Sequence, residues 1–246
     1  MENPILTFAI IALIMLGASY IQSVTGFGFG IFAMIFLPSL LSYTESNALS
    51  TILSAITSVY ITFLMRRHIS WKNMIFPLLG YVVSSVFSVI FIKTQTNDTL
   101  LLLLGVALFV LSVYFFFFSS KIKIKPSWYA GLIAGLISGV MGGMFAMSGP
   151  PVVIYFMQSE KSADRYLGTI SAYFVVSGII SIVTKAAAGF VTTSVLFGVC
   201  IGAMGMAAGA VLGKISREKT KPEYIKRAVY GVMAISGIVN IVTAMI

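Results

Sequence analysis

Two glycine-rich segments interrupt apolar stretches of the chain, one over residues 22–30 and one over residues 138–151. Their small or hydrogen-bonding members are Gln22, Ser23, Thr25, Gly26, Gly28 and Gly30, then Ser138, Gly139, Gly142, Gly143, Ser148, Gly149 and Pro150. Glycine lets a ligand approach the backbone closely, and the hydroxyl and amide groups offer hydrogen bonds. We predict that these residues line a substrate site.

The chemistry expected at such breaks is the binding of an anion. A helix that begins after a break presents free N–H groups and the positive end of its dipole, which together attract negative charge. Pro150 suits the first turn of such a helix because its missing N–H would be unpaired there.

The acidic residues favour the same ligand class. All of them fall at expected helix ends or in loops: Glu2, Glu45, Asp98, Glu160, Asp164, Glu218 and Glu223. Proton relays and cation paths usually need ionisable groups at membrane depth. A carboxylate-based proton pump or divalent-cation carrier is therefore disfavoured.

Glycine also has a purely structural role in membrane helices, where small residues let two backbones pack closely. We assign that role to the pairs Gly131 and Gly135, and Gly205 and Gly209. For the two breaks we favour a binding site, because matched helix interruptions in the two halves of a chain point to a transporter's substrate site.

The composition is that of a protein embedded in a lipid bilayer. The chain is 59% hydrophobic and 9% charged with a mean hydropathy of +1.02, and apolar runs of about 20 residues recur along it. This predicts an all-α polytopic membrane protein. The sequence contains no nucleotide-binding glycine loop, zinc-binding His pair or nucleophile elbow, so we expect no enzyme activity, cofactor, metal site or catalytic residue.

Hydropathy predicts six ordinary spans, at about 46–65, 74–92, 99–118, 164–184, 190–213 and 224–245. Two further apolar regions, 5–42 and 127–157, carry the glycine breaks near their middles. Each is either a kinked helix with an interfacial tail or a hairpin that enters and leaves on one side of the membrane.

The positive charges favour two hairpins. With hairpins, fourteen of the sixteen Lys and Arg residues fall on one side and only Lys93 and Lys185 on the other, whereas a single crossing at 127–157 gives seven against nine. Cytoplasmic loops are rich in Lys and Arg, so both termini should face outward. These loops, with anionic lipid beside them, account for the net charge of +9 without a nucleic-acid partner. For Lys185 we favour extension to the membrane interface over the alternative, a role in attracting an anion.

Each half then contains one broken hairpin and three spans, so the halves cross the membrane in opposite senses. This predicts two inverted-topology repeats in a single transporter domain: repeat 1 at about 1–118, a linker at 119–126, and repeat 2 at about 127–246.

At these motifs the chain resembles the TauE/SafE sulfite-exporter family. The resemblance lies in residues 25–30 with Leu37-Pro38, and in residues 131–139 running into Gly142-Gly143 and Gly149-Pro150-Pro151. Where the family's second motif usually has a run of glycines, this chain has residues 144–147, Met-Phe-Ala-Met. The resemblance implies transport of small sulfur-containing anions such as sulfite or organosulfonates.

We therefore expect a multi-pass protein of the bacterial inner membrane, a secondary transporter that works by alternating access around the two breaks. An anion channel with a filter formed by the same breaks is the alternative, and a membrane scaffold without transport is a third. Saturable flux with counterflow separates the transporter from the channel.

Overall fold

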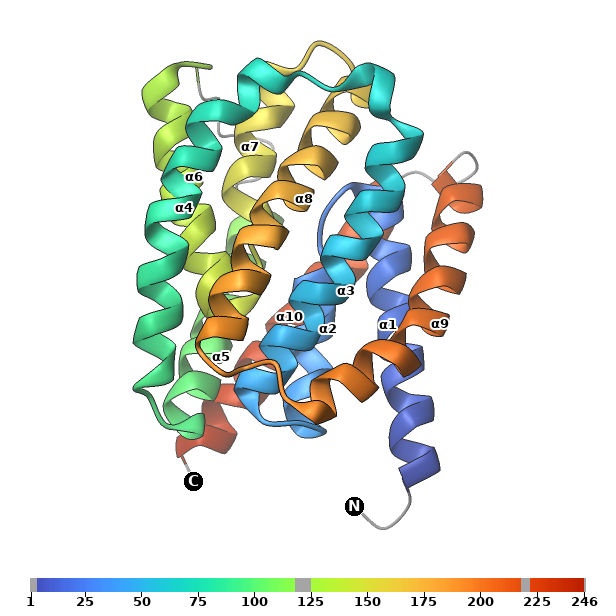
Figure 1. Cartoon of the computed structure of the whole chain (residues 1–246), viewed down its shortest axis with the longest axis vertical. Helices are drawn as coiled ribbons and strands as arrows, with labels where there is room; N and C mark the ends of the chain where they lie inside the picture. Colours follow the sequence, from blue (N-terminus) through green and yellow to red (C-terminus); the bar gives the residue numbers. More distant parts are fainter. Residues whose placement is uncertain (1–3, 118–124, 218–221, 246) are drawn as a thin grey trace.

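The structure, a computed structural model, describes residues 4–117, 125–217 and 222–245, and all its regular elements are helices (Figure 1). The α-helices are α1 (Pro4–Thr25), α2 (Phe29–Phe36), α3 (Tyr43–Leu64), α4 (Trp71–Lys93), α5 (Asn97–Phe117), α6 (Trp128–Phe145), α7 (Gly149–Ser159), α8 (Ala163–Ala187), α9 (Thr193–Arg217) and α10 (Pro222–Met245). Two short 3-10 helices, η1 (Leu37–Ser39) and η2 (Arg66–His68), join them.

The six ordinary spans agree with α3, α4, α5, α8, α9 and α10 to within about four residues at each end. Both broken regions also appear, as α1 with α2 and as α6 with α7. In the described part of the chain, seven helices are long and apolar enough to cross a membrane. The protein is therefore a multi-pass membrane protein.

Serine residues begin several of these helices. Ser42, Ser127 and Ser162 precede α3, α6 and α8, and each side chain accepts a hydrogen bond from the backbone N–H three residues later. The backbone N–H of Ser42 also donates to the Glu45 carboxylate, which completes a capping box. These caps satisfy N–H groups that the helix itself leaves unpaired.

The start of α1 and the end of α10 lie at one end of the bundle, which we call the terminal end (Figure 1). The opposite end carries η2 and the connection between α7 and α8, and we call it the basic end because Arg66, Arg67, Lys161 and Arg165 lie there. The predicted linker at 119–126 falls largely outside the described residues.

Close helix pairing explains most of the glycines. α6 packs along α4 and α9 packs along α1, while α5 pairs with α10 and α3 with α8. A Cβ on Gly135 would overlap the carbonyl of Pro77, and a Cβ on Gly205 or Gly209 would overlap the α1 backbone. The packing role assigned to these glycines is confirmed.

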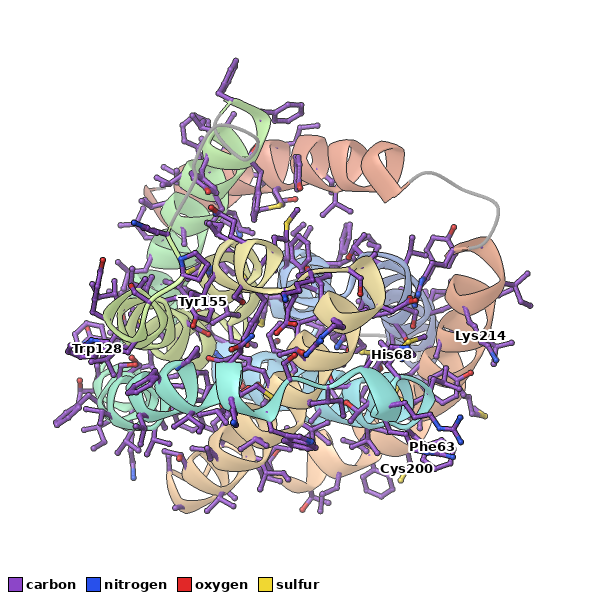
Figure 2. The ribbon with its side chains drawn as sticks, turned by 90° about the horizontal axis from the view of Figure 1, so that it is seen from above. Phe63, His68, Trp128, Tyr155, Cys200 and Lys214 are labelled. Carbon is purple, nitrogen blue, oxygen red and sulfur yellow. The ribbon has the colours of Figure 1, made fainter. Side chains whose placement is uncertain are left out.

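Large apolar side chains face away from the bundle. Figure 2, a view from above, shows Phe63, Trp128 and Cys200 at its rim, and the side chains of Phe63 and Trp128 are 64% and 60% exposed. Lipid would cover such a surface. Polar side chains are instead buried between the helices, where the two breaks lie.

Candidate functional site

The first break lies between α1 and α2. Gly26 and Gly28 take φ values of 85° and 98°, in the left-handed region that favours glycine. The Thr25 hydroxyl lies 2.8 Å from the Ile21 carbonyl oxygen and 2.7 Å from that of Phe27, and donates across the turn. The sequence thus ends α1 and reverses the chain within three residues, after which α2 begins at Phe29.

The second break lies between α6 and α7. Ala146 has a φ of 55° and is the one described non-glycine residue with positive φ, which is unfavourable for a side chain with a Cβ. It lies in the segment 144–147, where the resemblance noted above implies a run of glycines. The Ser138 hydroxyl donates to the Ser148 carbonyl oxygen at 2.6 Å and accepts from the Tyr173 hydroxyl at 2.9 Å, so α8 and α6 hold this turn in place.

The two breaks touch each other. A Cβ on Gly30 would overlap the carbonyl oxygen of Ala146, and a Cβ on Gly149 would lie 3.1 Å from the Cβ of Phe27. Segments about 116 residues apart in sequence therefore meet at one point inside the bundle.

Two small cavities lie at this contact, each of about 20 Å³. They share four lining residues: Ser54, Ala146, Ser148 and Phe174. The first-break cavity is also lined by Gln22, Phe27, Gly28, Phe29, Gly30, Ile31, Met147 and Gly149. The second-break cavity is also lined by Thr51, Ala55, Tyr81, Gly142, Ser177, Gly178 and Ser181. Each has room for about one water molecule, so the site is closed to a larger anion in this conformation.

The two short helices that follow the breaks, α2 and α7, which we call the half-helices, differ in how many free backbone N–H groups they bring to the site. The N–H groups of Phe29, Gly30 and Ile31 begin α2, have no acceptor within the helix, and belong to residues that line the first-break cavity. α7 begins Gly149-Pro150-Pro151, and proline has no N–H. The second half-helix therefore offers fewer backbone donors than the first.

A polar face of α3 closes the site from the side. The Gln22 side chain donates to Ser58 Oγ at 2.7 Å and accepts from Ser54 Oγ at 3.2 Å. Nearer the terminal end, Asn47 Nδ2 donates to the Met144 carbonyl oxygen at 2.6 Å, and the Tyr43 hydroxyl donates to the same oxygen at 2.7 Å. These bonds fix the end of α6 against α3.

Lys185 differs from the expectation that it extends to the membrane interface, which was wrong. Its side chain is fully buried in the last turn of α8. Its ammonium group donates to Thr51 Oγ1 at 2.6 Å and to the Gly142 carbonyl oxygen at 3.2 Å. It therefore lies against the second break, because α8 directs it inward toward α3 and α6.

The other predicted site residues lie at or near the breaks but face different neighbours. Ser138 holds the second turn, while Gly139 and Gly143 press against Ser84 and Ser88 of α4. Ser23 lies against Gly213 of α9. Pro150 is buried in the first turn of α7. Gly26 approaches Leu167 of α8, and Thr25 lines a larger cavity on the basic side.

Several polar residues at or beside the two cavities were not among the predicted site residues, and their spacing carries a signal that could have found them. Ser177, Ser181 and Lys185 recur every four residues and so share one face of α8. Asn47, Thr51, Ser54 and Ser58 form a similar polar face on α3. A polar stripe on an otherwise apolar membrane helix indicates a face turned toward protein or an aqueous cavity.

Comparison with known proteins places the chain in a family. The sequence is 23% identical to the "Probable sulfite/organosulfonate exporter TauE" of Cupriavidus necator over 231 residues, which cover 89% of this chain and 88% of that protein. No solved structure matches the chain significantly. The profile of the "Sulfite exporter TauE/SafE" family matches residues 11–239. The resemblance at the two breaks is confirmed along nearly the whole sequence, and the protein belongs to the sulfite exporter TauE/SafE family.

Proposed function

We propose that this protein is a secondary transporter of a small oxidised sulfur anion, sulfite or an organosulfonate, which binds where the two helix breaks meet. The contact between Gly30 and Ala146 carries this proposal. It brings an α2 N-terminus and a set of hydroxyl groups to one buried point. Oxygen atoms of a sulfite or sulfonate group accept hydrogen bonds from such donors.

The helix pairings support an inverted repeat. In an inverted repeat each helix of the first half corresponds to the helix five places later, so that α1 corresponds to α6 and α4 to α9. Under this exchange the pair α4 with α6 becomes the pair α9 with α1. The pairs α3 with α8 and α5 with α10 are exchanged within themselves. Such exchange is what a two-fold axis relating the two halves requires, and in an inverted repeat that axis lies in the membrane plane. The substrate would then bind near that axis, where α3 crosses α8 and the two breaks touch.

The cavities at the basic end support alternating access. One of about 430 Å³ is lined by Val24 and Thr25 of the first break and by Tyr166, Leu167 and Arg217. Toward the terminal end, Tyr43 and Asn47 bind the end of α6. We interpret this conformation as one entered from the basic end, which the positive-inside rule assigns to the cytoplasm. Both termini then face outward.

The test is uptake of radiolabelled sulfite by proteoliposomes that contain the full-length protein. A transporter gives saturable uptake that accelerates when unlabelled sulfite is loaded inside. Gly142→Leu should abolish this uptake, because a Cβ at that position would lie only 2.8 Å from the Tyr81 hydroxyl oxygen. Flux that never saturates and shows no counterflow would instead indicate the channel. Absence of flux for sulfite and for sulfonates would refute the proposed function.

A further inference from the structure

The charge of Lys185 is not neutralised by the part of the protein that the structure describes. The described ion pairs are Arg165 with Glu160 and Arg217 with Asp164, and both lie at the basic end. The acidic residues on the elements packed against α8 have other partners. Glu45 lies in the first turn of α3, and its carboxylate accepts a hydrogen bond from Thr192 Oγ1 at 2.7 Å. Glu160 at the end of α7 binds Ser70 and Asn73.

The Lys185 side chain therefore places a buried amino group among neutral oxygens. Removing a cation from water without an anionic partner is strongly unfavourable. Such a charge is usually retained where it has a function. Of its three N–H donors, two are bonded to Thr51 and Gly142, so one remains for a further acceptor.

The position of this ammonium is directly behind the second-break cavity. Both of its acceptors, Thr51 and Gly142, line that cavity. The rest of the lining is neutral, with hydroxyl groups from Tyr81, Ser148, Ser177 and Ser181. An anion that entered here would find the ammonium at hydrogen-bonding reach once the cavity widened.

The second half-helix gives a reason for a side-chain cation on this side. α2 begins with three residues that line the first-break cavity and whose N–H groups have no acceptor within the helix, whereas two of the first three residues of α7 are prolines, which have no N–H. A symmetric pair of backbone anion sites would therefore be incomplete on the α7 side. Lys185 lies on that side, with its ammonium group 3.2 Å from the Gly142 carbonyl oxygen.

We propose that Lys185 binds the anion directly. When the site is empty, its amino group donates hydrogen bonds to Thr51 Oγ1 and to the Gly142 carbonyl oxygen. When the site is filled, its ammonium donates to an oxygen of the sulfite or sulfonate group. The inference rests on the proposed function and adds the residue that selects for negative charge. It also predicts that the site discriminates by charge rather than by shape.

The experiment compares two probes of nearly equal shape, methanesulfonate and the uncharged dimethyl sulfone, by calorimetric titration of the purified full-length protein in nanodiscs. Wild type should bind methanesulfonate at least tenfold more tightly than the sulfone. Lys185→Met should weaken methanesulfonate binding by about tenfold to hundredfold, the range for a hydrogen bond to a charged group, and should bring the two probes to within about threefold.

Thermal stability separates the binding role of Lys185 from a purely structural one. If Lys185 serves binding, Met removes an unpaired buried charge, and the ligand-free Lys185→Met protein should melt at the wild-type temperature or above it. A melting temperature below that of the wild type would indicate the structural role. Lys185→Arg should keep the preference for the anion. Lys93→Met serves as the matched control, since Lys93 is an exposed lysine at the same end of the bundle and should change neither quantity.

The outcomes separate the two proposals. Wild-type flux of sulfite together with undiminished charge preference in Lys185→Met overturns the role of Lys185 and leaves the transporter intact. If Lys185→Met does not fold, loss of the preference in a folded Lys185→Arg protein overturns it as well. A wild-type protein that neither binds nor transports any of the sulfur anions overturns both.

Discussion

Gly30 of the first helix break lies against the carbonyl oxygen of Ala146 in the second, closer than any residue with a Cβ could approach. The contact joins the two halves of the chain at a single buried point. Because backbone meets backbone there, no rotation of a side chain can relieve a substitution.

Gly30→Ala should therefore abolish sulfite flux and lower thermal stability, since the new methyl group must separate the two breaks. Gly231→Ala is the control: nothing lies within 4 Å of a Cβ there, so the change should leave flux intact and stabilise α10 by about 1 kcal/mol through helix propensity. Flux assays and thermal melts of both variants test this. Normal flux in Gly30→Ala would show that the breaks separate without cost.

The hydrogen bonds from Asn47 and Tyr43 to the Met144 carbonyl oxygen should contribute unequally to the free energy of unfolding. Asn47→Ala removes a buried amide whose Nδ2 also lies 3.3 Å from the Gly143 carbonyl oxygen, and we expect a loss of about 1–3 kcal/mol. Tyr43→Phe leaves the bond from Asn47 in place, so its cost should be about 1 kcal/mol. Denaturant unfolding in detergent measures the order, and a larger loss for Tyr43→Phe would contradict it.

The two ion pairs of the basic end should also differ. The Glu160 side chain is only 2% exposed and accepts from Ser70 Oγ and Asn73 Nδ2, both at 2.8 Å, as well as pairing with Arg165. Glu160→Ala should cost about 1–3 kcal/mol because these groups lose a buried acceptor.

Asp164→Ala tests the exposed pair with Arg217 and should cost less than about 1 kcal/mol, as surface pairs do. Parallel unfolding curves for the two alanine variants decide the comparison. Equal losses would mean that the hydrogen bonds of Glu160 contribute little.

Orientation can be tested with cysteine labelling in a Cys200→Ser background. Lys161, between α7 and α8, and Lys93, the last residue of α4, are exposed and lie on elements that end at opposite ends of the bundle. If the basic end is cytoplasmic, a membrane-impermeant thiol reagent should modify Lys161→Cys only in inside-out vesicles and Lys93→Cys only in intact cells or spheroplasts. The reverse pattern would place the termini inside.

Much of the fold follows from sequence because lipid imposes simple rules. Apolar length predicted the spans. Their exact starts depend on caps that hydropathy does not describe: the prediction began the first ordinary span at about residue 46, whereas the Ser42 cap begins α3 at Tyr43. The breaks were predictable because Gly26 and Gly28 favour left-handed backbone.

The composition of the site was less predictable, for a physical reason. Hydropathy describes how much of a helix is apolar and not which face is turned inward. Lys185 near a helix end suits either the interface or the interior, and only the face shared with Ser177 and Ser181 distinguishes them. Likewise, nothing in the spacing separates Gly142, which lines a cavity, from Gly143, which packs on α4.

The small size of the two central cavities has a consequence for the cell. Each holds about 20 Å³, room for about one water molecule, so a sulfonate can enter only if the breaks move apart. In the transporter proposed above, breaks in contact would interrupt a file of water molecules through the described part of the bundle. Transport of the anion would then cost the cell none of its proton or sodium gradient through leakage.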